Sequence, residues 1–177
     1  SKFTAGDLLM LQNEVNNLDF MMEEAQRGLQ IAFNVSPFHP DLLKLPFIFA
    51  LIFGKRDRAA GIAQCSPNEK PEKLLYALEK HLPDVNIILT LGSRGSIYKA
   101  KGCRPLYQGI FKVHPVDTTA SGDTYTGFLL GSLLQGNKAE EAIKIAACAA
   151  AIAAPQGAAP SIPSLQEVLT SDLLKEE

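Results

Sequence analysis

Short uninterrupted apolar runs alternate along the chain with stretches in which apolar residues recur at helical spacing. Four of these runs have the length and composition of strands buried on both faces, and they cover residues 8–11, 30–35, 47–53 and 86–91. Helical spacing follows the first and third runs, at residues 18–29 and 67–81, the latter with Ser66 as the expected cap. Alternation of this kind is typical of βαβ units and predicts a parallel sheet with helices on both sides.

The pattern changes in the second half of the chain. Residues 96–100 and 106–113 flank a polar turn and predict an antiparallel hairpin at the edge of the sheet. Two helices are expected at 122–134 and 139–154, separated by the turn residues Gly136 and Asn137. We therefore expect a single α/β domain over residues 1–177, built as a three-layer α/β/α sandwich with a mainly parallel sheet.

Composition narrows the class of protein. The 177 residues are 46% hydrophobic and 20% charged, which excludes a disordered chain, and the longest apolar run is too short for a membrane span. A formal net charge of −2 makes a nucleic-acid partner unexpected. Cys65, Cys103 and Cys148 are odd in number and form no CxxC motif, so we interpret them as structural thiols in a reducing compartment. We expect a soluble, cytoplasmic protein without a membrane partner.

The most informative segment runs from residue 116 to residue 124, between an expected strand and an expected helix. Its small residues leave backbone N–H groups open at a helix N-terminus, where the macrodipole favours an anion, and Asp123 lies in the first turn. One interpretation is structural: Asp123 stabilises the helix end and Thr118 or Thr119 caps it. The other is an anion cradle beside a carboxylate, which suits phosphoryl transfer to an alcohol.

Residues 117–128 also resemble the C-terminal signature of the ribokinase-like (PfkB) carbohydrate kinases, D-T-T-[GA]-[AS]-G-D-[ST]-[FY]. Further segments of this family are similar to four other stretches, so that the resemblance covers essentially the whole chain: residues 88–96, 157–163, 9–14 and 33–37. The family has a ribokinase-like α/β/α fold, and its members transfer a phosphoryl group from ATP to a sugar hydroxyl.

The resemblance implies a role for each matched position. Asp123 is implied as the base that takes the sugar proton, and Ala120, Ser121 and Gly122 as the anion hole for the γ-phosphate. The nucleotide is implied to contact the end of the fourth strand and the turn after it, at Thr90, Gly92, Ser93 and Gly95. By itself, this short glycine turn is also consistent with a plain strand-end turn.

Cations and sugar are implied at further positions. Many relatives hold a monovalent cation, usually K⁺, at the positions matched by Asp117 and Thr119, with Gly157 and Ser161 completing the site. Glu14 matches a carboxylate that binds sugar hydroxyls, although it equally suits a solvated strand end.

The chain departs from the family in three respects, one of which is the loop before Gly157, about one residue shorter than in relatives. Where relatives carry an N-x-x-E motif for Mg²⁺, the aligned residues are 54–57, which leaves Asp57 as the candidate magnesium ligand beside Gly54 and Lys55. Family members are also considerably longer at the N-terminus, so we expect this chain to be the C-terminal portion of such a kinase.

Because the chain is shorter than its relatives, its function and its assembly both have alternatives. We expect a homo-oligomer or a complementing N-terminal half. The alternative to a sugar kinase is a catalytically impaired nucleotide-binding relative, and a kinase for a nucleoside or vitamin alcohol also remains open.

Overall fold

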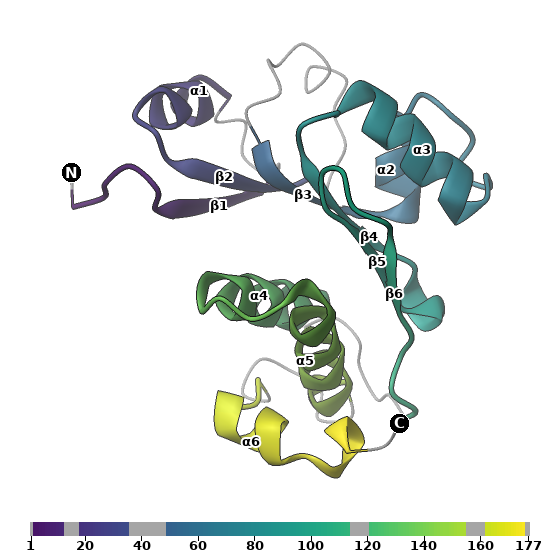
Figure 1. Cartoon of the computed structure of the whole chain (residues 1–177). Coiled ribbons are helices and arrows are strands. Elements are labelled where there is room, and N and C mark those ends of the chain that lie inside the picture. The colour runs from purple at the N-terminus through teal and green to yellow at the C-terminus, as the bar shows by residue number, and fades with distance from the viewer. Residues whose placement is uncertain (1, 13–17, 36–48, 114–120, 155–161, 176–177) are drawn as a thin grey trace. The chain divides into compact units, whose positions relative to one another are not determined.

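The computed structural model describes residues 2–12, 18–35, 49–113, 121–154 and 162–175, and Figure 1 shows their arrangement into strands and helices. The strands are β1 (Leu8–Gln12), β2 (Gln30–Asn34), β3 (Phe49–Lys55), β4 (Asn86–Thr90), β5 (Ser96–Lys99) and β6 (Leu106–Gln108). The helices are α1 (Leu18–Gln26), α2 (Arg56–Ile62), α3 (Pro71–His81), α4 (Ser121–Leu134), α5 (Ala139–Ala153) and α6 (Leu165–Thr170). Two short 3₁₀ turns lie at Gly92–Arg94 and Asp172–Leu174.

The sheet follows the order of the chain, β1-β2-β3-β4-β5-β6. Strands β1 to β4 run parallel, with Leu8 opposite Gln30 in the first pair and Lys55 opposite Thr90 in the third. Helix α1 connects β1 to β2, and α2 and α3 connect β3 to β4, as the βαβ pattern predicts; β5 and β6 are joined by a hairpin turn. The chain divides into two compact units, Ser1–Gly92 with Ile97–Pro105 and Ser93–Ser96 with Leu106–Glu177.

The first unit has its core between the parallel strands and the helices that flank them. Strands β2 and β4 contribute Ile31, Phe33, Ile87 and Leu89, each at most 1% exposed. Because these strands are covered on both faces, their sequences are continuous apolar runs. Helix α3 adds Leu74, Leu75 and Leu78 from one face, the spacing of an amphipathic helix.

The second unit is built around α4 and α5, which pack closely together. Helix α4 ends in a Schellman motif, in which Gly136 N–H donates to the Leu133 carbonyl and Asn137 N–H to the Ser132 carbonyl, with Gly136 at φ +84°. The buried face of α5 consists mainly of small residues such as Ala146 and Ala149, which allow its backbone to approach a neighbour closely.

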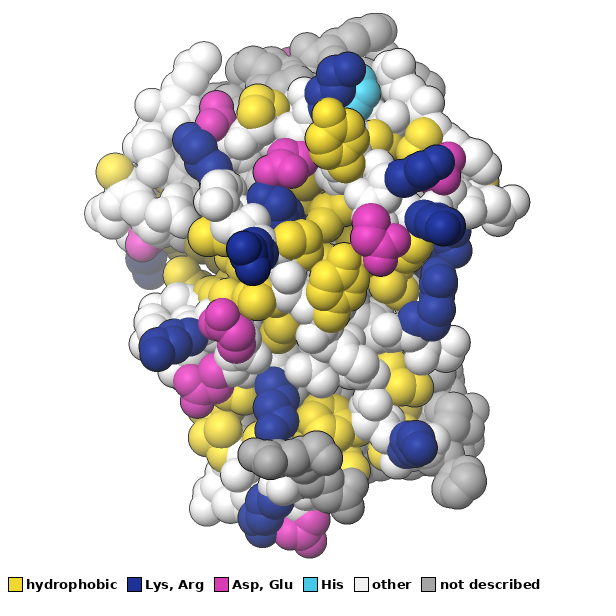
Figure 2. Space-filling view, turned by 45° about the vertical axis from the view of Figure 1, so that its right-hand side comes forward, with side chains coloured by type: hydrophobic (Ala, Val, Ile, Leu, Met, Phe, Trp, Pro, Cys, Tyr) yellow, Lys and Arg dark blue, Asp and Glu magenta, His cyan; other side chains and the backbone are white. Residues whose placement is uncertain are grey.

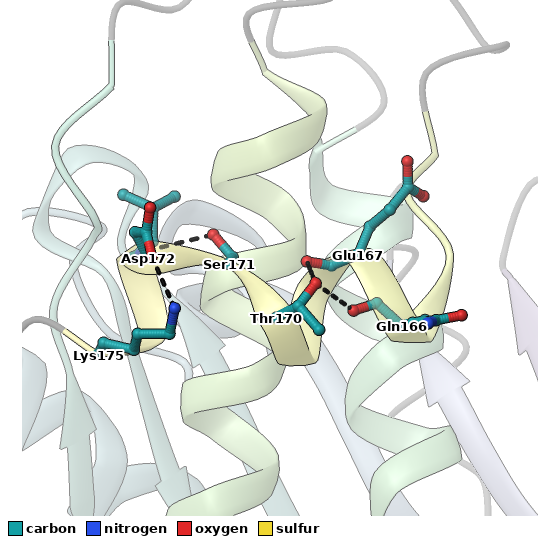
Figure 3. Close-up of polar contacts among 7 residues, drawn as sticks. Gln166, Glu167, Thr170, Ser171, Asp172 and Lys175 are labelled. Carbon is teal, nitrogen blue, oxygen red and sulfur yellow. Dashed lines mark hydrogen bonds and ion pairs between the residues drawn. The ribbon is translucent and has the colours of Figure 1, made fainter.

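Helix α6 packs on α5, and its N-terminus is stabilised by a reciprocal cap. Ser164 Oγ accepts from Glu167 N–H at 3.3 Å, and the Glu167 carboxylate accepts from Ser164 N–H at 2.6 Å. After the helix, Ser171 Oγ accepts from Leu173 N–H, and Lys175 pairs with Asp172 at 2.7 Å (Figure 3). These local contacts stabilise the two ends of α6 and the 3₁₀ turn after it, although α6 has only six residues.

Several boundaries differ from the sequence prediction. Strand β6 ends at Gln108 and not at residue 113. Strand β3 does not end before Gly54 but continues to Lys55, because β4 pairs with it over those positions. Residues 56–62 form α2 instead of a loop, since Ala59, Ala60 and Ile62 are buried on one face. Helix α3 begins at Pro71 and not at Pro67, because Ser66 Oγ accepts from Asn68 N–H in a local turn instead of capping a helix.

Basic and acidic side chains are interspersed on the face drawn in Figure 2, and hydrophobic side chains lie between them. None of the described helices is both long enough and apolar enough to cross a bilayer.

Candidate active site

The turn after β4 is the first part of the candidate site. Thr90 is the last residue of β4, and the 3₁₀ turn Gly92–Arg94 follows one residue later. Gly92 has φ +61° and Gly95 has φ +87°, a region that residues with a Cβ rarely adopt. Ser93 is exposed on this turn. The backbone is thus folded sharply where the resemblance implies nucleotide contacts.

Gly95 is also required by its surroundings. A Cβ at this position would lie 1.9 Å from the carbonyl oxygen of Gln108 and 2.9 Å from the Cα of Gly109. The turn therefore lies directly against the backbone at the end of β6, within the second unit. At Gly92, by contrast, a Cβ would meet nothing within 4 Å.

The first turn of α4 is the second part of the site. Ser121 begins the helix, and Gly122 and Asp123 are exposed in its first turn, so that the N–H groups there have no partner within the helix. Ser121 Oγ and Thr124 Oγ1 are buried without a hydrogen-bond partner, and Thr124 is only 3% exposed. A helix N-terminus can bind an anion, and an exposed carboxylate beside it can accept a proton.

A buried hydrogen bond connects these two parts. Ser96, which directly follows Gly95, has its Oγ 2.8 Å from the hydroxyl of Tyr125 on α4. Burial raises the pKa of Tyr125 to about 12, against a smaller lowering by the Ser96 hydrogen bond, so the phenol is neutral at physiological pH. Sequence reasoning missed both residues, because no pattern relates positions 29 residues apart.

Asp57, the candidate magnesium ligand, lies in the first turn of α2. Its side chain is 59% exposed, and its carboxylate accepts from Arg58 Nε at 3.0 Å, while Lys55 precedes it in the chain. Mg²⁺ takes oxygen ligands in a near-octahedral set, so one exposed carboxylate that is paired with a guanidinium does not by itself form its site. Within the described ranges, no group of three or more His, Cys, Asp or Glu residues is arranged for a metal ion.

The structure brings part of the predicted site together in one unit. Ser93, Gly95 and the first turn of α4 belong to the second unit, whereas Thr90, Gly92 and Asp57 belong to the first. The remaining predicted site residues lie outside the described residues: Glu14, Asp117, Thr119, Ala120, Gly157 and Ser161.

Comparison with known families agrees with this geometry. The family model described as pfkB family carbohydrate kinase matches residues 26–165, which include both the glycine turn and the start of α4. The chain belongs to the pfkB family of carbohydrate kinases.

Curated relatives of this pfkB family chain include ribokinases. It is 42% identical to the ribokinase of Schizosaccharomyces pombe over 90 residues, which cover 50% of this chain and 28% of the relative. It is 28% identical to the ribokinase of Haemophilus influenzae over 167 residues, which cover 92% of this chain and 54% of the relative. The chain thus spans about half the length of this relative and matches its C-terminal portion, as the sequence predicts.

Solved structures show the same fold. The Arabidopsis thaliana ribokinase complexed with ribose and ATP superimposes with a TM-score of 0.81 at 27% identity, covering 96% of this chain and 56% of that one. A Cryptococcus neoformans ribokinase in complex with ADP gives a TM-score of 0.78 at 23% identity over 92% of this chain and 59% of that one. The predicted ribokinase-like α/β fold, with a mainly parallel sheet and an antiparallel hairpin, is confirmed.

Proposed function

We propose that this chain is the nucleotide-binding and catalytic portion of an ATP-dependent kinase that phosphorylates a sugar hydroxyl. The observation that carries the proposal is the first turn of α4, in which Gly122 and Asp123 are exposed, in one unit with the glycine turn Ser93–Gly95. Family membership and the ribokinases among the relatives support sugar as the acceptor. Since the chain spans about half of that ribokinase, sugar positioning would need further polypeptide.

In the proposed reaction, backbone N–H groups of Ser121 and Gly122, with Ala120 before them, stabilise the negative charge of the transferring γ-phosphoryl group. Asp123 accepts the proton of the sugar hydroxyl as the oxygen–phosphorus bond to the sugar forms. The bond from the γ-phosphorus to the bridging oxygen breaks, and ADP leaves with that electron pair. The proton on the Asp123 carboxylate then passes to solvent.

The glycine turn is proposed to hold the nucleotide. A backbone without a side chain at Gly92 and Gly95 allows a ligand to approach the main chain closely, and Thr90 and Ser93 offer hydroxyl groups beside it. ATP is the nucleotide that the A. thaliana ribokinase structure contains, which supports it as the donor here.

Other partners follow from the same proposal. Asp117, Thr119, Gly157 and Ser161 would hold a K⁺ ion that helps to order the anion hole, and Glu14 would bind sugar hydroxyls. Because Asp57 does not fit a magnesium site, no step is assigned to Mg²⁺ bound there. A complementing N-terminal half or a homo-oligomer would supply the remaining sugar contacts. We also propose that residues 1–177 form one domain and that the protein is located in the cytoplasm.

One observation favours a second candidate, a nucleotide-binding relative without phosphoryl transfer. Asp57 is engaged by Arg58, and Gly54 and Lys55 stand where relatives carry an amide and its neighbour. A protein that binds ATP without organising a divalent cation for transfer would show this replacement.

A complementation experiment separates the two candidates. The chain is mixed with the N-terminal portion of the H. influenzae ribokinase, and transfer of the γ-phosphate of ATP to ribose or fructose is measured. We expect transfer with the native chain, a loss of at least about 1000-fold with Asp123→Asn, and unchanged transfer with Asp84→Asn, which alters an exposed carboxylate of the first unit. Full activity of Asp123→Asn contradicts the assignment of the base. Tight ATP binding by calorimetry, without transfer to any sugar, favours the second candidate.

A further inference from the structure

The buried contact between Ser96 and Tyr125 joins the two segments that the proposed function assigns to one nucleotide. Ser96 is the residue after the glycine turn, and Tyr125 lies two residues after Asp123 on α4. Their hydroxyl groups are 2.8 Å apart, and the two residues are 5% and 6% exposed, so no bulk water competes for the bond.

The glycine turn is also restrained by a steric contact. Gly95 lies so close to the carbonyl of Gln108 that even a methyl group has no space there. The turn therefore lies against the backbone of β6 at Gly95, and the residue that follows it bonds to the hydroxyl of Tyr125. A segment held by two such contacts keeps its place before any ligand binds, and preorganisation of this kind reduces the free energy cost of binding.

The chemistry of the bond suits this role. Each hydroxyl can donate or accept, and the aromatic ring carries its hydroxyl on a rigid side chain with two rotatable bonds. Since Tyr125 is neutral at physiological pH, the bond is insensitive to pH in that range. If one partner is removed, the other hydroxyl remains buried and unsatisfied, which costs more than removal of both.

We propose that Tyr125 is a positioning residue for the nucleotide: through Ser96, its hydroxyl sets the position of the turn Ser93–Gly95 relative to the first turn of α4. The inference rests on the proposed function in assigning these segments to a nucleotide. The hydrogen bond and its effect on the two segments are independent of that assignment.

The test compares four forms of the 177-residue chain: native, Tyr125→Phe, Ser96→Ala and the double variant. Calorimetric titration with ATP is made well below the unfolding temperature of each. We expect each single variant to bind ATP about tenfold more weakly, and the double variant to bind no more weakly than the weaker single one, because the two changes act on one bond. Additive losses, or native affinity in Tyr125→Phe, overturn the proposal.

Tyr98→Phe is the matched control. Tyr98 is a buried tyrosine of β5, 7% exposed, and burial raises the pKa of its hydroxyl as well. The substitution removes the same atom from a similar environment, two residues from Ser96 but in the other unit. A general loss of stability would affect both Phe variants alike, whereas loss of positioning weakens ATP binding only in Tyr125→Phe.

Amide hydrogen exchange without nucleotide separates this inference from the proposed function. In Tyr125→Phe, we expect faster exchange at residues 94–96 and 122–125 and native exchange elsewhere, while Tyr98→Phe leaves both segments unchanged. Native protection of these segments in Tyr125→Phe overturns the inference even if the chain binds ATP. Faster exchange there in a chain that does not bind ATP supports the positioning contact and contradicts only the proposed function.

Discussion

Lys99 of β5 forms an ion pair with Glu79 of α3 in which the ammonium is almost fully enclosed. The Nζ to Oε1 distance is 2.5 Å, and the lysine side chain is 9% exposed against 39% for the glutamate. Lys99 Nζ also donates to the carbonyl of Ala100 at 3.2 Å. The pair therefore satisfies a buried charge at the point where α3 covers the sheet.

Glu79→Ala is expected to destabilise the first unit by about 2–4 kcal/mol, because it leaves the Lys99 ammonium buried without its counter-charge. Lys99→Met removes the charge and keeps the volume, so it should lower the free energy of unfolding by less than Glu79→Ala does. Asp84→Ala is the control: it breaks the exposed pair with Lys101, whose side chains are 69% and 65% exposed, and should cost at most about 1 kcal/mol. Urea unfolding measures all three, and equal costs for the two alanine variants would contradict the role of burial.

Gly95→Ala is expected to destabilise the second unit by at least about 2 kcal/mol, since the residue has φ +87° and its Cβ would collide with the Gln108 carbonyl. Gly92→Ala should cost about 1 kcal/mol, because its φ of +61° is unfavourable but the space is open. Thermal and urea unfolding compare the two. If Gly95→Ala costs no more than Gly92→Ala, the close contact with β6 is wrong.

Glu167 gives the stability a dependence on acidic pH. Hydrogen bonds from the Ser164 side chain and then from its N–H lower the pKa of Glu167 in the folded state. A lowered folded pKa stabilises the protein above the unfolded pKa of about 4.3, and this contribution is lost as pH falls through the folded pKa. Melting temperatures between pH 7 and pH 3 should fall less steeply in Glu167→Gln than in the native chain, and parallel curves would contradict the reciprocal cap.

Cys103 and Cys148 should differ in reactivity. Burial raises the pKa of Cys148, against smaller lowering effects of Ser171 and Lys144, and its side chain is buried in α5. Cys103 is exposed in the hairpin turn. A thiol-reactive dye at pH 7.5 should modify Cys103 within minutes and Cys148 only after unfolding, because the thiolate is the reactive form. The Cys103→Ser variant identifies the fast phase, and an unchanged fast phase in it would be contrary to expectation.

Element types were largely predictable from the chain, since continuous apolar runs such as Ile87–Leu89 and the helical spacing of Leu74 and Leu78 each have one good structural solution. Helix α2 was not predictable, because its seven residues include the charged group Arg56–Arg58 and only a short apolar face. The extension of β3 through Gly54 depends on pairing with β4, which local sequence does not encode.

The candidate site was predictable only where a motif is contiguous. Asp123 and Gly122 lie in one local signature, and Gly95 lies in another, so their positions on a helix end and a strand-end turn followed from sequence. The bond from Tyr125 to Ser96 depends on how distant segments pack, and sequence spacing carries no such information.

Strand β1 lies at one end of the strand order, and its apolar residues Leu8–Leu11 are half-buried, whereas the neighbouring Ile31 and Phe33 of β2 are almost completely enclosed. In the described part of the chain, no strand pairs with the outer edge of β1. The isolated polypeptide thus offers a template onto which a further β-strand can grow, whether from a complementing fragment or from another molecule of itself. The isolated chain should therefore aggregate more as its concentration rises, and it should aggregate less when a lysine is placed on the outer edge of β1.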